Sequence, residues 1–130
     1  MEPPKEKEMI RELCAMLRQC GWQVRTNWYV VPGRADLGVG DILAKKRNCI
    51  MVVECKHLNG VHTMRKLHKV QEQANRYAAF AKLQHGNAKV LRFWYTNHEF
   101  KDMGEMGEEE SKHIRDAWER RTGKHVELRF

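Results

Sequence analysis

The sequence lacks the features of a membrane protein or a secreted protein. No apolar run follows Met1, so no signal peptide is predicted. The apolar run from Ile50 to Val53 is far too short to span a bilayer, which takes about 20 residues. We therefore expect a soluble, intracellular protein without a membrane partner.

Cysteine is scarce and is not spaced for metal binding. The four cysteines, which form no C-x-x-C pair, are Cys14, Cys20, Cys49 and Cys55. The seven histidines are scattered without the spacing of zinc ligands. We expect the cysteines to be small core residues in a reducing compartment, not disulfides or a zinc site.

Length and charge indicate one basic domain. A chain of 130 residues without an evident repeat is predicted to form a single domain, 1–130, with one core. The net charge is +7, and residues 102–119 hold seven acids against two bases, a net of −5, so the remainder carries +12. A strongly basic domain is typical of proteins that bind polyanions such as nucleic acid. The alternative is that these runs of charge are ordinary solvent-exposed surface.

Two short apolar segments, 40–45 and 49–56, are predicted to form a β-hairpin. The polar residues 45–48 between them are typical of a turn, which we expect to be a four-residue loop with Lys45 opposite Ile50.

This register would place Asp41 directly opposite Glu54, with Cβ atoms about 4.5–5.5 Å apart on one face. Side chains alternate along a strand, so Lys56 shares the face of Glu54 while Val53 and Cys55 point into a core. Two carboxylates that close repel each other unless a positive charge lies between them. A divalent cation with oxygen ligands would fit there, and Lys56 could polarise a water or neutralise a phosphate.

The pattern resembles that of the PD-(D/E)xK nuclease superfamily over residues 6–96. Asp41 matches the metal-binding aspartate, Glu54 and Lys56 match the (D/E)xK pair, and Gly40 stands where the family has proline. The resemblance implies an α/β restriction-endonuclease-like core, with a mixed central sheet flanked by helices in the order α-β-β-β-α-β. It also implies a nuclease that hydrolyses DNA with Mg²⁺ or Mn²⁺, with the backbone carbonyl of Cys55 as a further ligand.

A first helix is predicted from about residue 5 to residue 20, with an apolar stripe that includes Ile10, Leu13 and Leu17. Glu6 lies on the same stripe, and the resemblance implies an additional metal-site acid from this helix. Glu6 is the first choice, with Glu8 and Glu12 further from the stripe. The alternative is a solvated first-turn acid that favours the helix dipole.

A second amphipathic helix is predicted over residues 63–84, with Gln73 and Tyr77 stacked one turn apart. The pair is similar to the Q-x-x-x-Y motif of the RecB/Cas4 branch, which implies that Gln73 positions the nucleophile or the scissile phosphate. Gln71 is a second candidate for that role. Tyr77 is a candidate substrate contact, and core packing is its alternative.

Several cations are candidate phosphate contacts. They lie on the second helix and in the hairpin turn: Arg65, Lys66, Lys69, Arg76, Lys45, Lys46 and Arg47. Asp36, in the loop before Asp41, is a rival for the metal aspartate but lacks the strand that follows Asp41.

The remaining segments complete the predicted order. Strands are expected over 22–31 and 88–96, and the aromatic residues of the second are expected to pack inside the sheet. The segment 97–130 is predicted as an acidic loop, a helix over 108–121 and a strand over 125–130.

The resemblance leaves the type of nuclease open. A dimeric Holliday junction resolvase, a RecB/Cas4-type exonuclease and a virus-type replication-repair nuclease all fit. A catalytically silent nucleic-acid-binding module, or a subunit that needs a partner, remains the alternative from another class.

Overall fold

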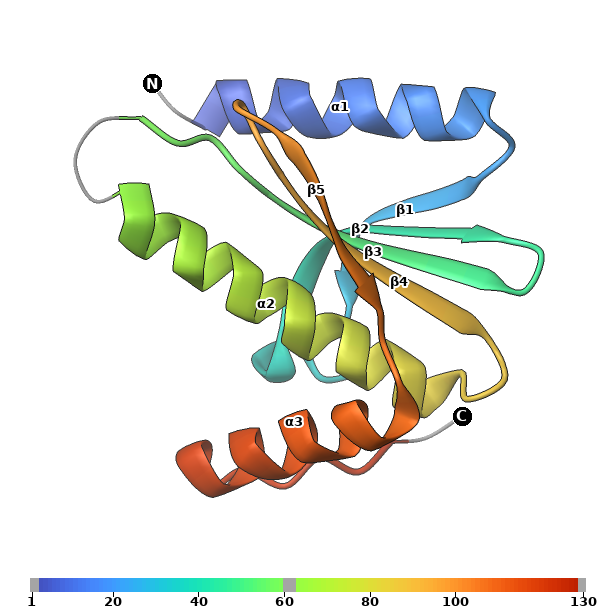
Figure 1. Cartoon of the computed structure of the whole chain (residues 1–130), viewed down its shortest axis with the longest axis vertical. Helices are drawn as coiled ribbons and strands as arrows, with labels where there is room; N and C mark the ends of the chain where they lie inside the picture. Colours follow the sequence, from blue (N-terminus) through green and yellow to red (C-terminus); the bar gives the residue numbers. More distant parts are fainter. Residues whose placement is uncertain (1–2, 60–62, 129–130) are drawn as a thin grey trace.

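A five-stranded mixed sheet with three α-helices forms the protein (Figure 1). The computed structural model describes residues 3–59 and 63–128. In chain order the elements are α1 (Pro3–Gln19), β1 (Gln23–Tyr29), the 3₁₀ turn η1 (Ala35–Leu37), β2 (Val39–Lys46), β3 (Cys49–Lys56), α2 (Thr63–Gln84), β4 (Lys89–Thr96), β5 (Phe100–Glu105) and α3 (Glu108–Thr122). The α-β-β-β-α-β order is confirmed as far as β4.

The strands lie in the order β1-β2-β3-β4-β5; β3 and β4 run parallel, and the other neighbouring pairs are antiparallel. α2 makes the crossover between these two strands, as a parallel pair requires. α1 covers one face of the sheet, while α2 and α3 cover the other (Figure 1). None of the helices in the described ranges is long and apolar enough to cross a membrane.

β3 is buried on both faces, which explains its continuous apolar sequence. Ile50 and Val52 pack in the core under α2, and Met51 and Val53 pack in the core under α1. The predicted alternation along this strand is therefore confirmed, and β3 holds the two layers of the molecule together.

The hairpin register is as predicted, but its turn is tighter. Lys45 pairs with Ile50, and the pairing continues to Lys46 and Cys49, so the connection is two residues long and not four. Arg47 has a φ of +55°, a left-handed conformation of the kind that tight hairpins need at a central turn position.

The expectation of a loop after β4 is wrong, because residues 100–105 form the edge strand β5. The acidic and glycine-rich composition hid this strand, since Asp and Gly are disfavoured in sheets. Packing compensates: Phe100 stacks on Phe93 with ring centroids 4.8 Å apart. Phe93 and Trp94 are buried, as expected of a packed strand.

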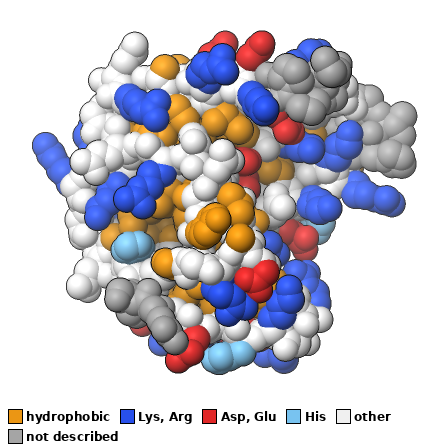
Figure 2. All heavy atoms as spheres, turned by 180° about the vertical axis from the view of Figure 1, so that it is seen from behind, with side chains coloured by type: hydrophobic (Ala, Val, Ile, Leu, Met, Phe, Trp, Pro, Cys, Tyr) orange, Lys and Arg blue, Asp and Glu red, His pale blue; other side chains and the backbone are white. Residues whose placement is uncertain are grey.

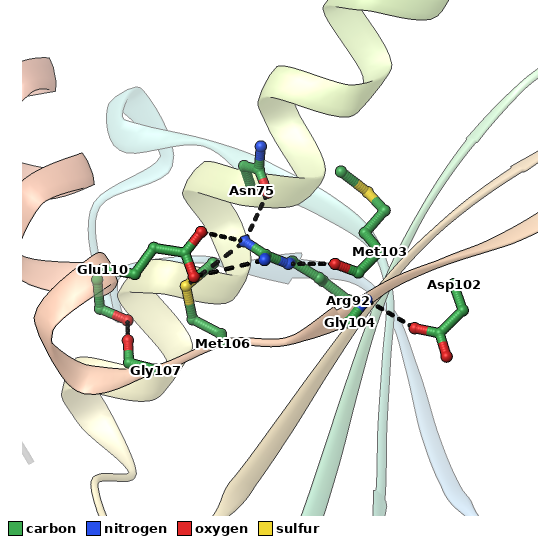
Figure 3. Close-up of polar contacts among 9 residues, drawn as sticks. Asn75, Arg92, Asp102, Met103, Gly104, Met106, Gly107 and Glu110 are labelled. Atoms are coloured by element: carbon green, nitrogen blue, oxygen red, sulfur yellow. Dashed lines mark hydrogen bonds and ion pairs between the residues drawn. The ribbon is translucent and has the colours of Figure 1, made fainter.

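Arg92 connects β5 and α3 to the rest of the fold (Figure 3). Its guanidinium donates to the Met103 carbonyl at 3.0 Å, to Asn75 Oδ1 at 2.8 Å and to Glu110 Oε2 at 2.9 Å. The planar guanidinium has several N–H donors, so it can bind groups from β5, α2 and α3 at the same time. The acidic third helix is thus attached through an ion pair between the largely buried Arg92 and the exposed Glu110.

The predicted C-terminal strand over 125–130 is also wrong within the described residues, since 123–128 carry no strand; residues 129–130 lie outside them. The chain leaves α3 at Gly123, whose φ is +71°. Its Val126 N–H donates to Glu119 Oε2 at 2.8 Å, and the Val126 side chain joins the core under α2. The tail therefore folds back on its own helix.

Candidate functional site

The central feature is a pair of carboxylates where β2 and β3 part. The last paired residues at this end are Ile42 and Val53, and Asp41 and Glu54 come next. The Asp41 N–H donates to Glu54 Oε2 at 2.8 Å, and the Cys55 N–H donates to Asp41 Oδ2 at 2.8 Å. Each carboxylate therefore accepts a hydrogen bond from the backbone of the other strand.

Burial makes this pair of acids electrostatically unfavourable. Glu54 is only 3% exposed. Burial raises the pKa of Glu54 well above its usual range, and the charge of Asp41 raises it further. Burial also raises the pKa of Asp41, and Glu6 adds to that rise while a backbone hydrogen bond from Cys55 opposes it. The pair is therefore predisposed to bind a proton or a metal cation.

Glu6 and Lys56 adjoin the pair from the α1 side. Glu6 Oε1 accepts the His57 N–H at 3.0 Å and lies 3.5 Å from Lys56 Nζ. The Lys56 side chain is 43% exposed, and its charge lowers the pKa of Asp41. Of the three candidate acids on α1, Glu6 is thus the one at the end of β3, whereas Glu8 and Glu12 are exposed. Lys56 can meet a ligand from solvent while remaining within electrostatic reach of Asp41.

Tyr77 and Arg76 approach from α2. The Tyr77 ring meets Trp28 edge-on with centroids 6.3 Å apart, and the Arg76 guanidinium lies 5.1 Å from the centre of the Tyr77 ring. The charge of Arg76 lowers the pKa of Glu54, so this cation partly offsets the buried acid. Tyr77 is buried, which fulfils the packing alternative for this residue.

Gln73 and Gln71 lie on α2 and are half-buried. In the part of the chain that the structure describes, Gln73 makes no side-chain hydrogen bond to the carboxylate pair. Gln73 lies one helical turn before Tyr77, on the helix that borders the site, but its side chain does not bond to the two carboxylates.

Gly40, directly before Asp41, lies where the backbone passes close to an aromatic ring. A Cβ atom at this position would overlap the indole of Trp28, so neither alanine nor proline fits there. The neighbouring Gly38 is similar, because its Cβ would lie 2.7 Å from the Tyr77 ring. Two glycines thus let the start of β2 pass close to two aromatic rings and deliver Asp41 to Glu54.

The hairpin cations do not gather at the carboxylates. Lys45, Lys46 and Arg47 are at the opposite end of β2 from Asp41. Lys46 Nζ donates to the Cys20 carbonyl at 2.6 Å, which ties the turn to the chain after α1. On α2, Arg65 and Lys69 are exposed and Lys66 is half-buried in the first two turns.

Asp36 does not compete for the site. Its carboxylate receives two hydrogen bonds from the exposed Arg34, at 3.0 and 2.9 Å, and this partner lowers the pKa of Asp36. The acid beside Glu54 is Asp41.

Sequence reasoning missed Asn27. The pairs Thr26–Ile42 and Trp28–Gly40 place Asn27 opposite Asp41, but Asn27 itself is unpaired in the ladder. Its φ is +50°, a left-handed conformation that asparagine tolerates better than most residues and that recurs at functional sites. An asparagine in a strand is the only sequence signal, and it is too common to have singled this residue out.

The donor set is small. Among residues 3–59 and 63–128, no three His, Cys, Asp or Glu side chains are grouped to hold a metal ion together. Asp41 and Glu54 have one further oxygen each, and backbone carbonyl and water would have to complete a coordination shell. Mg²⁺ suits such a site, because it keeps several waters and takes one or two protein carboxylates together with substrate phosphates.

No family model, curated protein or solved structure matches this chain.

Proposed function

We propose that the protein is a metal-dependent nuclease, with a restriction-endonuclease-like core, that hydrolyses phosphodiester bonds in DNA. The observation that carries the proposal is the pair formed by the half-buried Asp41 and the buried Glu54 at the parting ends of two strands, with Lys56 beside it. Two acids with raised pKa values gain most from a divalent cation.

Mg²⁺ or Mn²⁺ bound by Asp41, Glu54 and the carbonyl of Cys55 would lower the pKa of a water and stabilise charge on the phosphate. The fit rests on the chemistry of the donors, which are hard oxygen atoms of one buried and one half-buried carboxylate.

The roles of the protein groups follow from their positions. Lys56, as the ammonium that pairs with Glu6, orients the attacking water or neutralises charge that develops on the phosphate. Glu6 is 3.5 Å from the Lys56 ammonium, so it holds this cation near Asp41 and acts on the metal at most through water. Gln73 would turn toward the water or phosphate once substrate is bound, and Tyr77 and Arg76 line the α2 side.

Cleavage of four labelled DNA substrates, tested side by side in Mg²⁺, tests the proposal: a four-way junction, a flap, a linear duplex and a single strand. Symmetric nicking of the junction by a homodimer would indicate a resolvase, and progressive shortening from the ends an exonuclease. The matched control is Asp41→Asn, which keeps an oxygen to accept the Cys55 N–H. Cleavage equal in parent and Asp41→Asn would reject the proposal.

The alternative is a nucleic-acid-binding module without catalytic activity, or a subunit that needs a partner. A protein that binds DNA tightly but neither binds Mn²⁺ nor cleaves any of the four substrates would belong to this class.

Glu54→Gln is expected to stabilise the metal-free protein at neutral pH. The pKa of Glu54 is higher in the folded protein than in the unfolded chain, so the protonated carboxyl favours folding at low pH. This contribution to the free energy of unfolding is lost as pH rises through the folded pKa. The amide removes the buried charge and still accepts the Asp41 N–H, so we expect a gain on the order of 1–3 kcal/mol at pH 7–8. Below about pH 4, the unfolded pKa of glutamate, the two proteins should be equally stable.

Denaturant unfolding of both proteins in EDTA between pH 4 and 8 measures this difference. Added Mg²⁺ should then stabilise the parent and not Glu54→Gln, by RT ln(1 + [L]/Kd). A parent that is the more stable of the two in EDTA at pH 8 would contradict the assigned burial of charge.

A further inference from the structure

Three cations of α1 lie along one line of the helix. At about 100° per residue, Lys7, Arg11 and Arg18 fall within about 40° of one another around the helix axis. Their line borders the buried Cys14, whereas the nearest acids on the solvent side, Glu8 and Glu12, are turned away by about 100° or more from Lys7. The helix therefore has a basic edge beside its apolar stripe.

This basic edge forms one wall of a hollow that reaches Asp41. The hollow has a volume of about 380 Å³, and its lining residues come from α1, β1 and β2 and include Lys7, Ile10, Arg11, Cys14, Arg18 and Asp41. On the reverse side of the molecule, Lys and Arg side chains surround hydrophobic ones in the region of α1 (Figure 2). Asp41 thus belongs both to the candidate metal site and to this hollow.

The arrangement of charge specifies an elongated anion. Lys7 and Arg18 are about 16.5 Å apart along the helix, which is about five nucleotides of one strand at the 3.4 Å rise of duplex DNA. A site for a single small anion would have its cations converging on one point, whereas these three cations are arranged in a line along the helix. Ile10 and Cys14 give the hollow an apolar floor, which suits sugar or base surface beneath a phosphate chain.

We propose that this edge of α1 is the track for the phosphate backbone of the strand that enters the carboxylate site. This inference rests on the proposed function and adds where the substrate lies: the strand leaves Asp41 along Lys7, Arg11 and Arg18, not along the hairpin turn. The turn cations are at the far end of β2, so they cannot contact the phosphates next to the site.

Salt dependence of DNA binding tests the track without requiring cleavage. A fluorescent duplex is titrated in EDTA, over a range of KCl concentrations, with the parent and with the triple variant Lys7→Gln/Arg11→Gln/Arg18→Gln. These three residues are exposed, so the variant should fold, and circular dichroism checks it. The control, Lys101→Gln/Arg120→Gln/Lys124→Gln, removes the same charge from exposed positions on β5, α3 and the tail.

Each lost phosphate contact lowers the slope of log K against log[salt] by about 0.9 for duplex DNA. We expect the track variant to lose about 2 to 3 units of slope and the control to lose less than one. Equal slopes for the two variants, or a parent that does not bind DNA, would overturn the track. A parent with the expected slopes that cleaves nothing in Mg²⁺ would leave the track in place and reject the nuclease.

Discussion

Replacing Lys56 by methionine is expected to slow DNA cleavage by about 10²–10³-fold while DNA affinity stays within a few fold of the parent. The ammonium group lies 3.5 Å from Glu6 Oε1, and its charge also lowers the pKa of Asp41. Methionine keeps the length and the apolar stem of the side chain. The measurement is the single-turnover rate at saturating protein, with binding followed separately in EDTA.

The matched control is Lys101→Met, which removes the same charge from an exposed position on β5. Its cleavage rate should equal that of the parent. Stability should change little in either variant, because the Lys56–Glu6 ion pair is partly exposed and such pairs contribute about 0–1 kcal/mol. A Lys56→Met protein that cleaves at the parent rate would remove this lysine from the mechanism.

Gly40→Ala is expected to destabilise the protein by about 1–3 kcal/mol and to displace Asp41 from Glu54. The added methyl group would overlap the Trp28 indole, which is itself buried and packed against Tyr77. A change of this size lowers the melting temperature by roughly 4 °C per kcal/mol in a domain of this length. Cleavage should fall as well, since misplacing a catalytic group by about 1 Å can cost 10²-fold.

Gly86→Ala is the control, because a Cβ there meets nothing within 4 Å, and we expect it to be neutral within about 0.5 kcal/mol. Combining Trp28→Phe with Gly40→Ala tests whether the clash with the indole causes the loss of stability. Phenylalanine lacks the pyrrole ring that excludes the Cβ, so Gly40→Ala should be less costly in the Trp28→Phe background. Strictly additive effects would show that another contact excludes a side chain at Gly40.

The core hairpin could be predicted from sequence because a local rule determines it. Strand alternation and a polar turn set the pairing of Lys45 with Ile50, and the same register brings Asp41 beside Glu54. The turn length was missed because a left-handed Arg47 has no clear sequence signal. β5 was missed because its composition disfavours a strand, and the contacts that hold it, Phe100 on Phe93 and the Met103 carbonyl on Arg92, form only once β5 lies beside β4.

The parts of the site that depend on helix docking were less accessible. Helical periodicity selected Glu6 from the acids of α1, but only the packed structure brings it to Lys56 and to the His57 N–H. The basic edge of α1 and the left-handed Asn27 were not recognised, because neither gains meaning until α1, β1 and β2 are adjacent. The cations that were chosen in the turn are separated from the site by the length of β2.

Calorimetric titration of Mn²⁺ into the purified protein tests the central claim most directly. The Asp41 N–H donates to the Glu54 carboxylate and the Cys55 N–H donates to the Asp41 carboxylate, and the raised pKa values of both acids mean that a nearby positive charge would stabilise them. We predict one Mn²⁺ site in the parent, competed by Mg²⁺, and no such site in Asp41→Asn or Glu54→Gln. A parent without a binding isotherm, or an Asp41→Asn variant that binds as the parent does, would contradict the account.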